Sequence, residues 1–211
     1  MSSAKFYGLN DLDAKVAKFV DFDNGFYFEA GANNGIWQSN TLYFEESRGW
    51  RGILVEPIPH RFLECVMNRP KAIVECGALV PTGWNRSYVD LTYCNLMTVT
   101  KGSWPSSEAE AAHIERGKCY MPDEKTFDFQ ARPWTISALL DKHSVRHVDF
   151  MSIDLEGFEM QALQGLDFSR HKPTWLLVEE RKPLELLPFL SPWYSLVEKL
   201  THHDYLFRSK D

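Results

Sequence analysis

Two acidic residues, Glu29 and Glu56, lie at the ends of apolar runs in the first part of the chain, where their carboxylates could contact a ligand. The run that contains Glu29 passes into a turn of glycine, alanine and asparagine at 31–35. A buried parallel strand that ends in small residues lets a ligand approach its backbone closely. A carboxylate at the end of the second strand of a doubly wound sheet can accept hydrogen bonds from both hydroxyls of a ribose. Together the two segments predict a pocket for an adenosine-containing cofactor.

The turn after Glu29 narrows the choice of cofactor. It lacks the third glycine of the GxGxxG motif, so nothing in it is built to hold a pyrophosphate at the start of a helix. A dinucleotide is therefore disfavoured, and S-adenosylmethionine (SAM) is the leading candidate. In this interpretation Glu29 accepts hydrogen bonds from the ammonium group of the methionine moiety, and Pro57 packs on the adenine. The residues that keep the backbone open to the ligand are Gly31, Ala32 and Gly35. The alternative is a tight turn with an incidental acid.

A second group of acidic residues begins at the end of the fourth predicted strand, at 148–154, and continues to Glu159. The end of that strand lies beside the first strand at the topological switch point, where doubly wound sheets bind ligands. Asp154 and Glu156 would therefore point toward the transferred group, whereas Glu159 serves equally well as an acid in the first turn of a helix. Asp154 with Glu179 or Glu180 could hold a divalent cation through oxygen ligands. Carboxylates at neighbouring strand ends are also common without a metal, so no metal is predicted.

The histidines and the search for nucleophile motifs add little to the prediction of the chemistry. His113 lies in a long connecting segment at 102–133. It is the candidate general base if that segment closes over the site. His202-His203-Asp204 resembles a metal-binding cluster, but we interpret it as the solvated end of a surface helix. The chain contains no GxSxG, Walker A or HExxH pattern, so nucleophilic hydrolysis, ATP hydrolysis and zinc protease chemistry have no support.

Strands and helices alternate along the chain and predict a mostly parallel, doubly wound α/β sheet. The third strand ends in Gly77 and Ala78, whose small side chains would let adenine lie against the backbone. The predicted strands are 25–30, 52–56, 72–76, 148–154, 174–178 and 205–208. The predicted helices are 11–21, 39–47, 59–68, 135–143, 158–166 and 192–200.

The alternation is interrupted between the third and fourth strands. Residues 87–93 and 96–101 alternate like a β-hairpin around Cys94-Asn95, and a polar segment at 102–133 follows with a helical patch at 108–116. A connection of this length within a compact domain is usually a lid or a binding loop. We therefore expect one domain over 1–211, with a helical lead-in at 1–24 and an inserted hairpin and substrate lid at 85–133.

Composition sets outer limits on function. The 211 residues are 44% hydrophobic and carry a formal charge of −6, without a block of lysine and arginine. This balance favours a small neutral or cationic acceptor and disfavours a nucleic-acid partner. The alternative is that the charge only keeps the protein in solution. No apolar run reaches the length of a membrane span, and the start of the chain lacks the pattern of a signal peptide. Four scattered cysteines indicate reduced thiols and a cytoplasmic location. The oligomeric state is not predicted.

Four passages of the chain resemble the FkbM family of SAM-dependent methyltransferases: residues 28–35, 39–41, 49–57 and 149–159. The resemblance implies a Rossmann-like class I methyltransferase fold and O-methylation of a sugar, a glycan or a natural-product hydroxyl. It adds Asn33, Ser39, Asn40 and Asp154 to the expected cofactor-binding residues. It leaves Asp154, Glu156 and His113 as the candidate catalytic residues.

Three points stay open at this stage. The insert matches nothing in the family, so the acceptor is not identified. The chain ends soon after the last predicted strand, so we expect a shortened sheet edge or strands supplied by the inserted hairpin. A SAM-binding module without catalysis, or a nicotinamide-dependent oxidoreductase, is the alternative function.

Overall fold

A seven-stranded sheet forms the centre of the computed structural model, which describes residues 4–120, 123–180 and 183–211. Its strand order is β11-β12-β10-β9-β1-β2-β3. Strands β10, β9, β1, β2 and β3 run parallel to one another. Strand β12 runs antiparallel to them, and the edge strand β11 pairs antiparallel with β12 and so runs in the same direction as β10. The predicted α/β class with a mostly parallel sheet is confirmed. The strands are β1 Phe26–Ala30, β2 Arg51–Glu56, β3 Ile73–Cys76, β9 Phe150–Ile153, β10 Trp175–Glu179, β11 Tyr194–Lys199 and β12 Asp204–Ser209.

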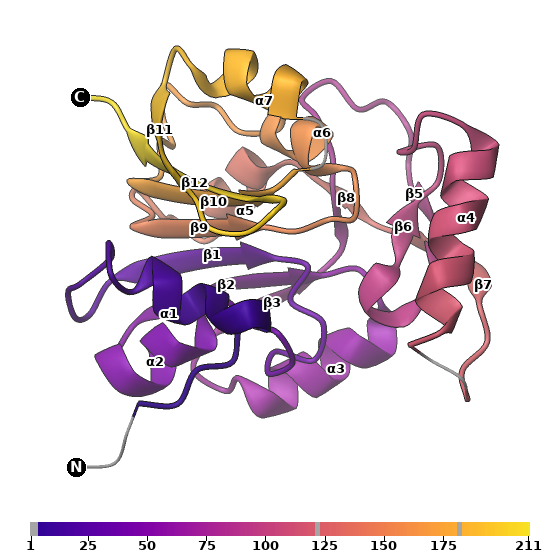
Figure 1. The fold of residues 1–211 in the computed structure, drawn as a ribbon, viewed down its shortest axis with the longest axis horizontal. Coiled ribbons are helices and arrows are strands. Elements are labelled where there is room, and N and C mark those ends of the chain that lie inside the picture. The colour runs from indigo at the N-terminus through magenta and orange to yellow at the C-terminus, as the bar shows by residue number, and fades with distance from the viewer. Residues whose placement is uncertain (1–3, 121–122, 181–182) are drawn as a thin grey trace.

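Helices cover both faces of this sheet, as Figure 1 shows. Side chains alternate between the faces along each strand, so Phe28 packs with helices α5, α6 and α7 while its neighbour Tyr27 packs with α1, α2 and α3. The predicted lead-in helix is shorter than expected and follows a 3-10 turn. The helices are η1 Leu9–Asp11, α1 Leu12–Val16, α2 Leu42–Arg48, α3 Pro59–Asn68, α5 Ile136–Lys142, α6 Glu159–Leu163 and α7 Pro183–Leu190.

The inserted segment builds its own small sheet beside one end of the central sheet (Figure 1). Its middle strand β5 pairs antiparallel with β6 and with β7, and the predicted hairpin is the β5–β6 pair. The helical patch is helix α4, whose N-cap Ser106 accepts a hydrogen bond from the backbone N–H of Ala109. The elements of the insert and its base are β4 Ala78–Leu79, β5 Val89–Tyr93, η2 Asn95–Met97, β6 Val99–Thr100, α4 Ser107–Lys118, β7 Phe127–Ala131 and β8 Pro133–Trp134.

The C-terminal edge differs from expectation. Residues 192–200, predicted as a helix, contain strand β11, and helix α7 was not predicted. The register of β11 shifts between Leu196 and Glu198, so its side chains lose the strict alternation that identifies a strand in sequence. Pro183 and Pro188 hide the helical pattern of α7. Among the residues that the structure describes, the sheet edge is not shortened, and the insert adds no strand to the central sheet.

None of the helices described is long and apolar enough to cross a membrane. All four cysteines are free, as the sequence indicated.

Candidate active site

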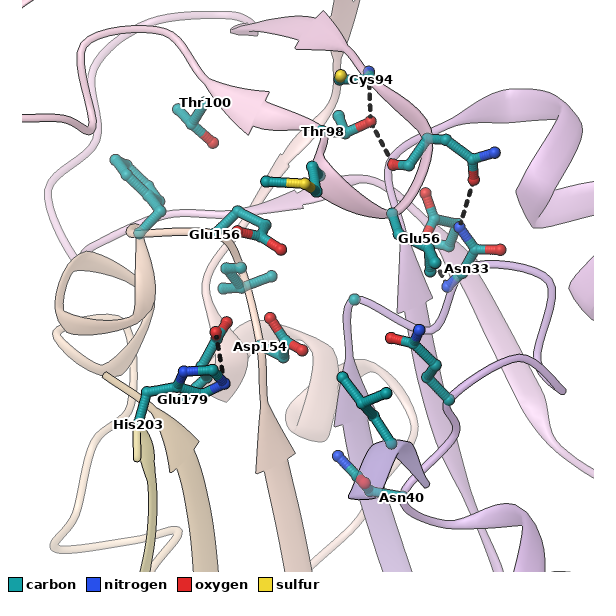
Figure 2. A pocket seen from close by; sticks show the side chains of 18 of the residues that line it. Asn33, Asn40, Glu56, Cys94, Thr98, Thr100, Asp154, Glu156, Glu179 and His203 are labelled. Carbon is teal, nitrogen blue, oxygen red and sulfur yellow. Dashed lines mark hydrogen bonds and ion pairs between the residues drawn. The ribbon is translucent and has the colours of Figure 1, made fainter. Parts of the chain in front are cut away.

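A cavity of about 1050 Å³ opens where the parallel strands end at their carboxyl edge, and Figure 2 shows it from close by. It is lined by the turn after β1, the ends of β2, β9 and β10, the hairpin of the insert and the turn between β11 and β12. Eight of the predicted cofactor-binding residues line it: Gly31, Asn33, Asn40, Glu56, Pro57, Gly77, Ala78 and Asp154. Four do not line the cavity: Glu29, Ala32, Gly35 and Ser39.

Gly31 stands where β1 and β9 come closest. Its φ of +82° is in the left-handed region, and a Cβ atom at this position would lie 2.1 Å from the backbone oxygen of Asp154. A side chain here would force the two strand ends apart. Glycine therefore lets the turn after β1 and the end of β9 meet at the switch point.

Glu56 ends β2 in a buried position that two backbone groups define. Its Oε2 accepts a hydrogen bond of 2.7 Å from Asn33 N, and its Oε1 accepts one of 2.8 Å from Ile58 N. Burial raises the pKa of this carboxyl to about 7, although both hydrogen bonds favour the ionised form. Each carboxylate oxygen has a second lone pair. The group can therefore accept further hydrogen bonds from a ligand in the cavity.

Glu29, predicted to accept hydrogen bonds from the methionine ammonium, has its carboxylate occupied by the chain itself. It accepts hydrogen bonds from Ser39 Oγ at 2.9 Å, Asn40 N at 2.8 Å and Thr41 Oγ1 at 2.5 Å. The residue is buried and does not line the cavity. Glu29 thus fixes the loop between β1 and α2, and Ser39 belongs to that support.

Arg69, which the sequence did not single out, anchors the same loop from the end of α3. Its guanidinium is fully buried, forms an ion pair of 2.9 Å with Glu45 and donates to Gly35 O at 2.9 Å. It also donates to Tyr27 OH at 2.9 Å. An arginine beside a proline at a helix end looks solvent-exposed in sequence, so only the tertiary structure reveals this network. The loop that carries Asn33 and Asn40 into the cavity is held by Glu29 and Arg69 together.

Three carboxylates converge at the other end of the cavity. Asp154, Glu156 and Glu179 each offer an oxygen within 4.8 Å of the others. Asp154 lines the cavity (Figure 2), and desolvation together with the Glu179 carboxylate raises its pKa well above the usual range. A proton on Asp154 would reduce the repulsion between these carboxylates. The cluster by itself therefore assigns no metal.

Glu159 shapes the loop between β9 and α6 from within the core. Its Oε1 accepts hydrogen bonds from Leu155 N at 2.8 Å and from Gly157 N at 3.0 Å. These bonds support a tight loop in which Glu156 has a φ of +53° and Gly157 one of +102°. Burial raises the pKa of Glu159 to about 7. The residue is thus a structural support for the position of Glu156.

A prediction about pH follows from Glu159. Because its pKa is raised from 4.5 to about 7, the folded protein holds this proton more tightly than the unfolded chain. The resulting stability is complete below about pH 4.5 and is lost as the pH rises toward 7. Glu159→Gln keeps an acceptor oxygen but cannot ionise. We expect the wild type to lose up to ~3 kcal/mol more than this variant across that interval, measured by urea unfolding. Parallel pH curves for the two proteins would contradict the expectation, and exposed Glu185→Gln serves as the control.

His113, the predicted general base, does not reach the cavity. Its side chain is fully buried in α4, with Nε2 at 3.0 Å from Met97 O and 3.6 Å from Glu156 Oε2. The ring lies 4.6 Å from that of Trp104, whose Nε1 donates to Glu156 O at 3.2 Å. His113 and Trp104 therefore connect the insert to the loop after β9, and His113 does not line the cavity.

His203 was predicted to lie on a solvated helix end, which is wrong. It lies in the turn between β11 and β12 and lines the cavity, with Nε2 3.3 Å from Glu179 Oε1 (Figure 2). The incorrect helix at 192–200 concealed it, because a helix there would carry the histidine away from the strand ends. The His-His-Asp sequence was the signal that could have revealed it.

Aromatic side chains also line the cavity. Within the insert, Trp104 and Tyr120 do so, whereas Phe127 stacks on Tyr93 at a ring distance of 4.8 Å. Residues from the main domain complete the set: Trp37, Phe158 and Tyr205.

The sheet order, with the antiparallel strand β12 between β10 and the edge strand β11, and the cavity at the switch point define the Rossmann-like fold of class I methyltransferases. A model of the methyltransferase FkbM domain matches residues 29–207. The chain belongs to this family, as the sequence resemblance indicated. No curated protein matches it.

Two solved structures show the same fold. A methyltransferase FkbM from Methylobacillus flagellatus aligns at 16% identity with a TM-score of 0.52, over 88% of this chain and 44% of its own. A TehB-like SAM-dependent methyltransferase from Corynebacterium glutamicum aligns at 10% identity with a TM-score of 0.50, over 99% of this chain and 91% of its own. The chain thus spans less than half the length of the FkbM structure.

Proposed function

We propose that the protein transfers a methyl group from SAM to a hydroxyl of a sugar, a glycan or a small natural product. One observation carries the proposal: a single cavity joins the buried carboxylate of Glu56 at the end of β2 to an acidic end at Asp154. Family membership supports the reaction class. The class of acceptor is inferred from the side chains that line the cavity.

The residues at the Glu56 end fit SAM. Glu56 would accept hydrogen bonds from the ribose hydroxyls, since backbone donors already hold its carboxylate in place. Ile58, Leu79 and Ala78 offer apolar or small surfaces for adenine. SAM, when bound, supplies a methyl group already activated on a positively charged sulfur. The protein then has chiefly to orient an acceptor oxygen toward that methyl group.

The acidic end fits a hydroxylated acceptor. Asp154 and Glu156 can hydrogen-bond to hydroxyl groups, and the rings of Trp104 and Tyr120 offer flat surfaces on which a sugar can stack. The formal charge of −6 favours a neutral or cationic acceptor over a nucleic acid.

Cofactor binding is tested first. Calorimetric titration with SAM and with S-adenosylhomocysteine should show binding of both, and each should raise the melting temperature because each binds the folded state. NAD should do neither. Binding of NAD in place of SAM would favour the oxidoreductase, and the absence of binding by both SAM and S-adenosylhomocysteine would refute the proposal.

The acceptor is tested next. The protein is incubated with SAM carrying a labelled methyl group and with sugars, glycosides, hydroxylated natural products or total RNA, each with and without EDTA. We expect a gain of one methyl group on a hydroxylated small molecule by mass spectrometry, and none on RNA. A protein that binds SAM but methylates nothing in the panel would instead match the non-catalytic binding module.

Glu56→Ala should weaken SAM binding by ~1.5–3 kcal/mol, the scale of hydrogen bonds to a charged group. The reason is the loss of the ribose acceptor together with the acceptor of Asn33 N and Ile58 N. Calorimetry measures the affinity, and circular dichroism checks the fold. Glu185→Ala, an exposed glutamate on α7, is the matched control. Unchanged affinity in Glu56→Ala would mean that the ribose is held elsewhere.

A further inference from the structure

Methylation of a hydroxyl requires a group that accepts the hydroxyl proton. The predicted base, His113, is buried in α4 beneath Trp104 and does not line the cavity. His203, by contrast, is partly exposed and lines it. Its position on the β11–β12 turn places it beside the acidic end, on the same side as Asp154 and Glu179 (Figure 2).

Two carboxylates face one nitrogen of this imidazole. His203 Nε2 lies 3.3 Å from Glu179 Oε1 and 3.7 Å from Asp204 Oδ2. Both carboxylates favour a proton on Nε2, which leaves the other ring nitrogen able to accept one. In His203 that other nitrogen is Nδ1.

The backbone around the imidazole is held on both sides. Glu180 N donates to the carbonyl of His203 at 2.7 Å, which ties the turn to the end of β10. His203 N donates to Thr201 Oγ1 at 3.3 Å, and the ring of His202 packs against that of His203 at 3.8 Å. The histidine is therefore positioned by the ends of two strands.

We propose that His203 is the general base of the reaction and that Glu179 is the residue that positions it. The assignment rests on the proposed function, O-methylation of a hydroxyl. As the acceptor oxygen bonds to the methyl carbon, the carbon–sulfur bond breaks and its electron pair stays on sulfur. The hydroxyl proton passes to Nδ1 of His203, and the Glu179 carboxylate stabilises the imidazolium that forms.

The neighbouring carboxylates suit other tasks. An oxygen of Asp154 lies within 4.8 Å of one of Glu179, and the neighbouring negative charge makes Asp154 a poorer site than His203 for an ionised base. Glu156 is held from the insert by Trp104 and His113. His203 combines access to the cavity with a carboxylate partner, which is the arrangement that a general base requires.

The test compares His203→Ala with His147→Ala. His147 also faces a carboxylate, Asp149 at 3.1 Å, but at the start of β9, the opposite end of the strands from the cavity. In His203→Ala we expect SAM affinity within a few-fold of wild type and a kcat lower by ~10²–10⁴-fold, with recovery when imidazole is added. His147→Ala should match the wild type. Glu179→Gln should lower kcat with little change in the KM of the acceptor, and imidazole should not restore it.

A crystal structure with bound SAM gives a readout that needs no acceptor. The position in line with the sulfur–methyl bond, ~3 Å beyond the methyl carbon, should lie within hydrogen-bond reach of His203, directly or through one water. A greater separation would overturn the assignment even if no acceptor is known. Full activity in His203→Ala, or a loss that imidazole does not restore, would also overturn it. Failure of the proposed function is recognised separately, because the wild type would then methylate no hydroxyl in the panel.

Discussion

Replacing Arg69 by methionine is expected to lower the free energy of unfolding by ~3–5 kcal/mol, because it leaves the charge of Glu45 buried and unpaired. The guanidinium is fully buried, and its partner Glu45 is 6% exposed. The substitution also removes the donors to Gly35 O and Tyr27 OH. Since Gly35 lies in the loop that lines the cofactor end of the cavity, SAM affinity should fall as well. Urea unfolding and calorimetry measure the two effects.

An exposed arginine provides the matched control. Arg170 pairs with Asp141 at 3.0 Å and with Asp167 at 2.8 Å, but half of its side chain is exposed. Arg170→Met should change stability by less than ~1 kcal/mol. The double variant Arg69→Met/Glu45→Met should recover part of the loss, because it removes the buried charge as well. Equal effects of Arg69→Met and Arg170→Met would show that the buried network adds nothing.

The central sheet could be predicted from the sequence because burial leaves a clear pattern. Strands β1, β2, β9 and β10 are covered by helices on both faces, so they appear as nearly continuous apolar runs. The C-terminal edge gives no such signal. Strand β11 exposes most of its residues and changes register within its length, so its residues were predicted as a helix.

The cavity could be located, but the roles of its residues could not all be assigned. Gly31, Glu56 and Asp154 line it because the topology brings strand ends together whatever their surroundings. Glu29 shares the same kind of position, yet its carboxylate turns to the loop at 39–41. The direction in which a side chain points depends on tertiary contacts, as does the location of His203. Sequence pattern records which strand a residue ends, and not which way the side chain points.

Replacing helix α4 by a flexible linker should abolish methyl transfer while leaving SAM affinity within a few-fold. The insert contributes Trp104, Arg116 and Tyr120 to the cavity, and α4 buries His113 against Glu156. Without α4, the acidic end of the cavity would open to water, and Glu156 would lose its contact with His113. The Glu56 end of the cavity belongs to the central sheet and should persist. A helix of 12 residues spans ~18 Å, so the excision of 106–119 needs a glycine-serine linker that can cover this distance.

A point variant distinguishes two roles of the insert, a substrate lid and a structural support of the cofactor pocket. Trp104→Ala removes the hydrogen bond to Glu156 O and the ring against His113, but leaves α4 in place. If the insert is a lid that holds the acceptor end closed, this variant should lose most methyl transfer, retain its melting temperature within a few degrees and bind SAM normally. In the linker variant, α4 no longer covers the cluster of Ile58, Tyr93 and Cys94, to which it contributes Ile114. If SAM binding and the cooperative unfolding transition disappear together there, the insert supports the cofactor pocket itself, and its assignment as a substrate lid is wrong.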